Sequence, residues 1–93
     1  MPGFVYVLTN RPNGTLYVGV TRDLVRRVVE HRAGCVGGFT RAHGLRRLVY
    51  FERLDAMYDA LVREKRLKAW KRAWKVRLIE EANPLWRDLS ESF

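Results

Sequence analysis

A chain of 93 residues is long enough for one small domain and too short for two, so we expect a single domain over residues 1–93. A hydrophobic content of 47% argues against disorder, and no apolar run approaches the ~18 residues of a membrane span. Lys and Arg number 18 against 10 Asp and Glu, and the formal charge of +8 favours a polyanionic partner, most simply a nucleic acid. A merely soluble basic protein is the alternative.

The cysteine content and the N-terminus indicate where the protein acts. Cys35 is the only cysteine, so neither an internal disulfide nor a cysteine-based zinc site is expected. The first residues lack the charged region and apolar core of a secretory signal. We therefore expect a cytoplasmic protein without a membrane partner; its oligomeric state stays open.

The first two elements expected are strands joined by a tight turn. Phe4–Leu8 and Thr15–Val20 are rich in β-branched and aromatic residues. Between them, Asn13-Gly14 is a strong signal for a hairpin with a two-residue turn. The chain therefore begins with an antiparallel hairpin.

That turn fixes a register, and the register places two tyrosines. With Asn13-Gly14 at its centre, Tyr6 pairs with Thr21 and Asn10 pairs with Tyr17. Because side chains alternate along a strand, Tyr6, Tyr17 and Gly19 share one face. The glycine should leave a gap in which a ligand can approach the backbone.

A helix follows the hairpin and is expected to end at about His31 or Arg32. Thr21 is expected as its N-cap, and Asp23 in the first turn suits the helix dipole. The apolar stripe of this helix consists of Leu24, Val25, Val28 and Val29. Arg27 and His31 lie four residues apart on one face beside that stripe, where they can contact a phosphate.

The next stretch, Ala33–Gly44, is expected to be a loop because it contains four glycines, Gly37 among them. Thr40, Arg41 and His43 are its polar candidates for contact with a phosphate. A third strand is predicted over Leu48–Phe51. Asp55 is expected to cap the helix after it.

That later helix carries an acid in an apolar stripe. The stripe has the i, i+3, i+4, i+7 spacing of a buried face and consists of Met57, Ala60, Leu61, Glu64 and Leu67. A carboxylate at Glu64 must be paired or bind a metal, because burying an uncompensated charge is costly. Eight basic residues of the segment 63–77 surround it.

The apolar face continues into a third helix, after a bend near Lys71. Its members are Trp70, Trp74, Leu78 and Ala82. Asn83-Pro84 ends this helix, since proline disfavours helical backbone in the residue before it. The amphipathic tail Leu85–Leu89 should pack back on the core.

Each polar candidate also has an ordinary explanation. Tyr6 and Tyr17 can be plain strand aromatics, and Arg27 a solvated helix residue. His31 suits a helix end and Asn83 a helix C-cap, while Glu64 can form a structural ion pair. The combination and order of these residues carry more information than any single one.

In combination they resemble the GIY-YIG nuclease family over nearly the whole chain. Val5-Tyr6 matches the end of the first family motif and Tyr17-Val18-Gly19 the second, while Phe4 replaces the first glycine. Thr15–Thr21 and Asn83–Leu89 look like the short stand-alone bacterial branch, the YhbQ-like or UPF0213 proteins. The family's polar positions are matched by Tyr6, Tyr17, Arg27, His31, Glu64 and Asn83.

The resemblance implies a fold and an activity. The fold is an α/β (α+β) domain with a small three-stranded antiparallel sheet flanked by helices, in the order β-β-α-β-α-α, and the elements above agree with it. The activity is metal-dependent hydrolysis of a phosphodiester. A lone carboxylate at Glu64 suits Mg²⁺ or Mn²⁺.

The other roles follow from that chemistry. Arg27 would clamp the phosphate oxygens, and Tyr6 or Tyr17 would deprotonate or orient the attacking water if a nearby cation lowers the tyrosine pKa. His31 would relay a proton or hold the phosphate, and Asn83 would orient Glu64. Contacts to DNA are expected from Thr21, Arg41, Lys68, Lys71 and Arg72.

Two classes of function remain. The leading hypothesis is an endonuclease acting on DNA, with single-stranded DNA first and branched or nicked DNA second. The alternative is a non-catalytic nucleic-acid-binding protein that uses the basic segment Arg63–Arg77, or a subunit of a DNA repair assembly.

Overall fold

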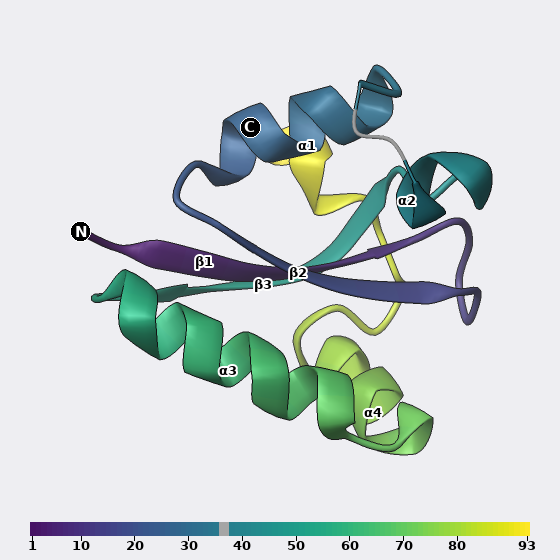
Figure 1. Ribbon diagram of the computed structural model, residues 1–93. Coiled ribbons are helices and arrows are strands. Elements are labelled where there is room, and N and C mark those ends of the chain that lie inside the picture. Colours follow the sequence, from purple (N-terminus) through teal and green to yellow (C-terminus); the bar gives the residue numbers. More distant parts are fainter. Residues whose placement is uncertain (36–37) are drawn as a thin grey trace.

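The computed structural model describes residues 1–35 and 38–93, and it has the expected three-stranded antiparallel sheet flanked by helices. The elements are β1 (Gly3–Thr9), β2 (Leu16–Thr21), α1 (Leu24–Arg32), α2 (Phe39–Ala42), β3 (Arg47–Leu54), α3 (Met57–Ala69), α4 (Arg72–Ala82) and a short 3₁₀ helix, η1 (Leu89–Ser92). The strand order is β2-β1-β3. Helix α1 covers one face of the sheet, and α3 and α4 cover the other (Figure 1).

The hairpin register differs from the predicted one by two residues. Gly14 N–H donates to the Arg11 carbonyl at 2.9 Å, so Pro12 and Asn13 are the central residues of the turn. Proline presets the backbone of the first central position, and asparagine tolerates the left-handed backbone of the second, where φ is 57°. The expected turn at Asn13-Gly14 is therefore wrong.

The corrected register pairs Tyr6 with Gly19 and Leu8 with Tyr17. Because the shift is an even number of residues, both tyrosines stay on the same face of the sheet. The predicted face is therefore right although the predicted partners are wrong.

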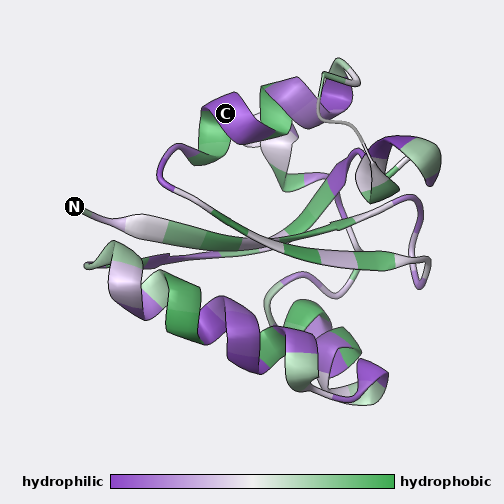
Figure 2. Cartoon of the chain, in the orientation of Figure 1, coloured by the Kyte–Doolittle hydropathy of each residue, from purple (hydrophilic) through white to green (hydrophobic). Residues whose placement is uncertain are grey.

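Two apolar clusters hold the layers together. The cluster between the sheet and helices α3 and α4 contains Val5, Val7, Val18, Val49, Ala60, Leu67, Ile79 and Trp86. The cluster beneath α1 contains Tyr6, Leu8, Leu24, Val28, Leu45 and Leu48. In Figure 2 the strands are mostly hydrophobic and the helices show alternating hydrophilic bands, as a layered fold requires. Among the described residues, none of the helices is both long and apolar enough to span a bilayer.

The N-cap of helix α1 lies two residues later than predicted. The side chain of Asp23 accepts a hydrogen bond from Arg26 N–H at 3.1 Å, so Asp23 and not Thr21 is the N-cap. The buried side chains of α1 are Leu24, Val28 and His31. The predicted stripe was too wide: Val25 and Val29 are exposed, because the sheet contacts only a narrow strip of this short helix.

The stretch predicted as a loop contains helix α2, with Thr40 buried and Arg41 exposed. Residues 36 and 37 of that prediction lie outside the described residues. Strand β3 exceeds the predicted Leu48–Phe51 at both ends, because it pairs along the whole of β1.

Helices α3 and α4 meet at the predicted bend. Trp70 and Lys71 have extended backbones, with ψ of 150° and 148°, and so separate the two helices. The expected cap at Asp55 is wrong: Ala56 precedes α3, and Asp55 forms an ion pair with Arg53.

The apolar stripe of the two helices is also narrower than predicted. Ala60 and Leu67 are buried as predicted, whereas the predicted members Leu61, Trp74 and Ala82 are exposed. The residue that α4 buries completely is Ile79, which the predicted stripe did not include. The sheet covers only the faces of α3 and α4 that meet it, so residues at the margins of the predicted stripe reach solvent.

The C-terminal tail returns to the sheet through Asn83, the C-cap of α4. Its buried amide donates to the carbonyls of Val49 (3.0 Å) and Arg87 (2.9 Å) and accepts from Arg87 N–H (3.0 Å). Trp86, 2% exposed, then fills the core as predicted for the tail. Asn83 thus joins α4, β3 and the tail.

We expect Asn83→Ala to destabilise the fold by roughly 2–4 kcal/mol, because three hydrogen bonds are lost and a buried carbonyl is left unpaired. Denaturant unfolding measures the change. Asn10→Ala, which removes one exposed hydrogen bond to Thr15 N–H, should cost much less. Equal effects of the two substitutions would contradict this role of Asn83.

Candidate active site

The site is built around the contact between Tyr6 and Gly19, which lie opposite each other in the hairpin. A Cβ atom on Gly19 would lie 2.5 Å from the Tyr6 hydroxyl, so the phenol ring lies directly across the glycine. The expectation of a gap for a ligand at Gly19 is therefore wrong, because the Tyr6 ring occupies that space. Glycine is needed at position 19 because the side chain of its strand partner, Tyr6, occupies the space that a Cβ atom would take.

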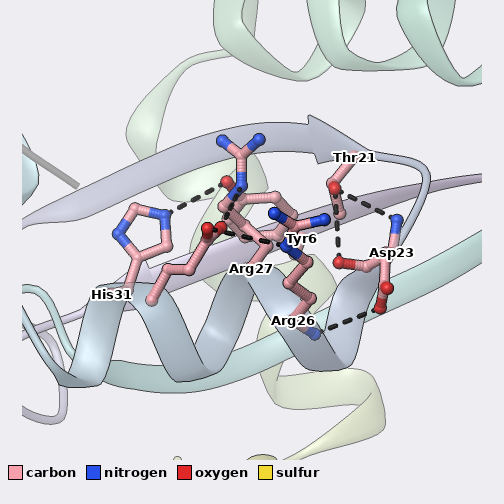
Figure 3. A network of polar contacts seen from close by, with 7 residues as sticks. Tyr6, Thr21, Asp23, Arg26, Arg27 and His31 are labelled. Atoms are coloured by element: carbon pink, nitrogen blue, oxygen red, sulfur yellow. Dashed lines mark hydrogen bonds and ion pairs between the residues drawn. The ribbon is translucent and has the colours of Figure 1, made fainter. Parts of the chain in front are cut away.

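Three aromatic groups from three elements meet at this point. The Tyr6 hydroxyl lies 3.3 Å from Nε2 of His31, which α1 buries against the sheet (Figure 3). The ring of Tyr17 is centred 6.4 Å from that of Tyr6 and 6.1 Å from that of His31. The sheet and α1 thus bring together both predicted tyrosines and the predicted histidine, with Tyr17 the less buried tyrosine.

Arg27 borders this group from α1 and is held by an acid. Its Nε atom lies 3.5 Å from the carboxylate of Glu30, which also pairs with Arg26 at 3.7 Å. Figure 3 shows both arginines directed from the same side of α1. A cleft of about 480 Å³ opens beside Arg27 at the start of the helix, next to the buried Thr21. A phosphate entering the cleft would compete with Glu30 for these guanidinium groups.

Burial sets the protonation of the aromatic groups. Desolvation, and then the neighbouring Tyr17, raise the pKa of Tyr6 to about 12, more than the positive charge of Arg27 lowers it. Burial also lowers the pKa of His31, and Arg27 adds to this effect. Both side chains are therefore neutral at neutral pH. The lowered tyrosine pKa that the chemistry would favour is not found at Tyr6.

Glu64 lies on α3, on the other side of the sheet from α1, and its side chain is only 15% exposed. It pairs with Lys68 at 3.4 Å, and its negative charge contributes to the raised pKa of Tyr6. In residues 1–35 and 38–93, no three His, Cys, Asp or Glu side chains gather as a metal site. One carboxylate completed by waters and phosphate oxygens fits Mg²⁺, which keeps several waters when bound to protein.

The remaining predicted residues are spread around the molecule. Asn83 is engaged with the backbone of β3 and the tail, so its amide is not available to Glu64 in the way expected. Arg72 donates to the carbonyls of the hairpin turn at 2.7 and 2.8 Å, and Lys71 lies over the ring of Trp74. Arg41 is exposed on α2.

Glu30 is the site residue that the sequence analysis missed. It follows Arg26 by four positions and Arg27 by three, and these are the two helical spacings at which side chains meet. That spacing would have identified it.

A tyrosine hairpin followed by a helix with arginine and histidine is the arrangement of a GIY-YIG domain. Residues 2–77 match the model of the GIY-YIG catalytic domain, and the chain belongs to this nuclease family. Asn83 lies beyond the matched residues.

Within the family, the chain groups with the UPF0213 proteins. It is 41% identical to UPF0213 protein NP_0776A of Natronomonas pharaonis, over 84% of this chain and 91% of that one. It is 32% identical to UPF0213 protein SSP2268 of Staphylococcus saprophyticus, over 84% and 94%. The solution NMR structure of UPF0213 protein BH0048 from Bacillus halodurans superposes with a TM-score of 0.59 at 28% identity, covering 95% of this chain and 93% of that one.

The raised pKa of Tyr6 predicts a loss of stability at alkaline pH. The folded state holds the phenol proton more tightly than the unfolded chain, so stability is full below pH 10 and falls as pH rises towards 12. Tyr50, whose pKa burial also raises to about 12, contributes in the same window. The free energy of unfolding, measured in urea across this pH range, should therefore fall less steeply for Tyr6→Phe than for wild type. Tyr58→Phe, at an exposed tyrosine, should follow wild type, and a Tyr6→Phe profile that also did so would contradict the assignment.

Proposed function

We propose that this protein is a divalent-metal-dependent endonuclease that cuts DNA, with a preference for single-stranded or branched DNA. Membership of the GIY-YIG nuclease family implies a nuclease acting on DNA and an activity that uses a divalent metal. The observation that supports catalysis by this chain is the cluster of Tyr6, Tyr17 and His31 over Gly19, with Arg27 beside it. A net charge of +8 supports a polyanionic substrate.

The burial and charge of each residue suggest its role in the reaction. Arg27 binds the non-bridging oxygens of the phosphate, in place of its partner Glu30. Tyr6 stays protonated and serves as a fixed hydrogen-bonding group. Tyr17 is less buried than Tyr6, which supports it as the tyrosine that would orient the attacking water. His31 is neutral, and its Nε2 atom lies 3.3 Å from the Tyr6 hydroxyl, so a proton can be exchanged at that atom, while its buried Nδ1 atom has no protein partner in the described residues.

Glu64 is the residue that would hold the metal ion. A bound divalent cation supplies charge stabilisation to the phosphate and to the leaving oxygen. Lys68, half-exposed, is the present counter-ion of the carboxylate and can turn towards solvent or a DNA phosphate. Mg²⁺ and Mn²⁺ both suit such a site of one carboxylate.

One observation favours a second function. The pair between Glu64 and Lys68 satisfies the carboxylate without any metal, as it would in a nucleic-acid-binding protein that does not cut. In such a protein the basic segment Arg63–Arg77 would bind the phosphates. Loss of Glu64 would then leave binding intact and have no activity to remove.

A cleavage assay separates the two. We expect wild type to cut DNA with Mg²⁺ or Mn²⁺ but not with EDTA, and Glu64→Ala to lose on the order of 100-fold or more in rate. Matched single-stranded, duplex and branched substrates would rank the preference. Asp59→Ala removes an exposed acid from the same helix and should keep the activity.

The outcomes are distinct. Cutting that Glu64→Ala retains would point to a contaminating nuclease or a different site. If wild type cuts none of the three forms but binds them with a steep salt dependence, the non-catalytic function is supported.

Glu30 generates a separate prediction. Glu30→Gln should tighten DNA binding roughly two- to fivefold, because a half-exposed ion pair with Arg26 and Arg27 no longer competes with phosphate. Fluorescence anisotropy in EDTA measures this affinity without cutting. Asp55→Asn makes the same change of charge beside Arg53; neither of these residues lines the cleft, so this substitution should alter the affinity less. Equal gains for both variants would show a general charge effect.

A further inference from the structure

An aromatic groove lies at the junction of α3 and α4, outside the cluster around Tyr6. It encloses about 220 Å³, and its lining residues are Trp70, Trp74, Arg77, Leu78 and Glu81. The two indole rings meet edge to face, with centroids 6.1 Å apart and planes at 84°. Arg77 and Glu81 form an ion pair at the rim.

Core packing does not explain why position 74 carries a tryptophan. Trp70 packs against the core cluster, and Trp86 is 2% exposed within it. Trp74, in contrast, is 53% exposed, and Ile79 is the residue that α4 buries completely. An exposed indole beside a second indole offers a flat surface on which another ring can stack.

Basic side chains connect this groove to Glu64. Lys68 contacts the Glu64 carboxylate at 3.4 Å, and Lys75 donates to the Lys68 carbonyl at 3.2 Å. The ammonium group of Lys71 lies 5.7 Å from the centre of the Trp74 ring. From Glu64 to Ala69, the last residue of α3, is about 7.5 Å along the helix axis, at 1.5 Å per residue. A row of lysines therefore runs from the proposed metal ligand to the exposed indole.

We propose that the Trp70–Trp74 groove binds an unpaired base of single-stranded DNA, whose backbone follows Lys68, Lys71 and Lys75 towards Glu64. The choice of DNA rests on the proposed function. Stacking needs a base with a free face, which an unpaired strand presents and a duplex interior does not. Lysines along the path match phosphates, and they repel a second copy of this basic chain.

Binding to single-stranded DNA in EDTA tests the groove without requiring cleavage. Trp74→Ala should weaken the binding of a labelled oligothymidylate about tenfold, and that of a duplex of the same length less than twofold. In wild type the oligonucleotide should quench tryptophan fluorescence, and most of this quenching should vanish in Trp74→Ala. Tyr58→Ala, at the other end of α3, also removes an exposed aromatic and should leave both affinities unchanged.

Trp74→Leu keeps an apolar side chain in the groove without an aromatic face. It should reproduce the loss, and a melting temperature close to that of wild type shows that the fold is intact. Trp74→Phe should recover part of the affinity.

Three results would overturn the proposal. They are unchanged binding in Trp74→Ala and Trp74→Leu, an equal loss for duplex and single strand, and a wild-type dimer that Trp74→Ala converts to monomer. If wild type cuts DNA while both variants bind normally, the groove proposal fails alone. If wild type cuts nothing but single-strand binding depends on Trp74, the nuclease proposal fails and the groove stands.

Discussion

The Tyr6 ring lies across Gly19, and the rest of the candidate site depends on that contact. A side chain at position 19 would displace the ring and break its 3.3 Å contact with His31. The ring can lie there only because the turn at Pro12-Asn13 pairs these two positions in the hairpin. The same close packing removes water from the phenol and keeps it protonated. Because position 19 is a glycine, the ring of Tyr6 can lie over it. This contact therefore fixes both the geometry and the charge of the site.

Much of this arrangement could be predicted because strand geometry has a period of two. The wrong turn residues moved each predicted pairing by two positions, and an even shift leaves every side chain on its face. No such periodicity helps to predict which residue caps a helix. Thr21 and Asp23 are both good capping residues, and the choice depends on how β2 leaves the sheet, which the sequence does not specify.

Tertiary partners were harder to predict than elements. Glu64 was expected to face inwards with a partner, and the structure supplies Lys68 one turn away, a contact that local spacing suggests. The partners of Asn83 come from β3, far away in the chain, so its structural role could not be inferred from its neighbours. Trp74 illustrates the same limit: its place in an apolar pattern predicts burial, but it is 53% exposed, because α4 packs Ile79 and not Trp74 into the core cluster.

The charges around the site are compensated in a way that suits an anionic substrate. Arg27 is paired with Glu30 and Lys68 with Glu64, while the chain as a whole keeps a charge of +8. Exposed or half-exposed ion pairs contribute at most about 1 kcal/mol, so they hold the cations in place at little cost when a phosphate replaces the acid. A fully buried pair would resist that exchange, and an unpaired arginine would lose more conformational freedom on binding. Pairs of intermediate exposure keep the basic groups ordered and still available. In the Arg27–Glu30 pair, the guanidinium would leave Glu30 and bind the phosphate. In the Lys68–Glu64 pair, the carboxylate would leave Lys68 and bind a metal cation. Substrate and metal would therefore each separate one ion pair.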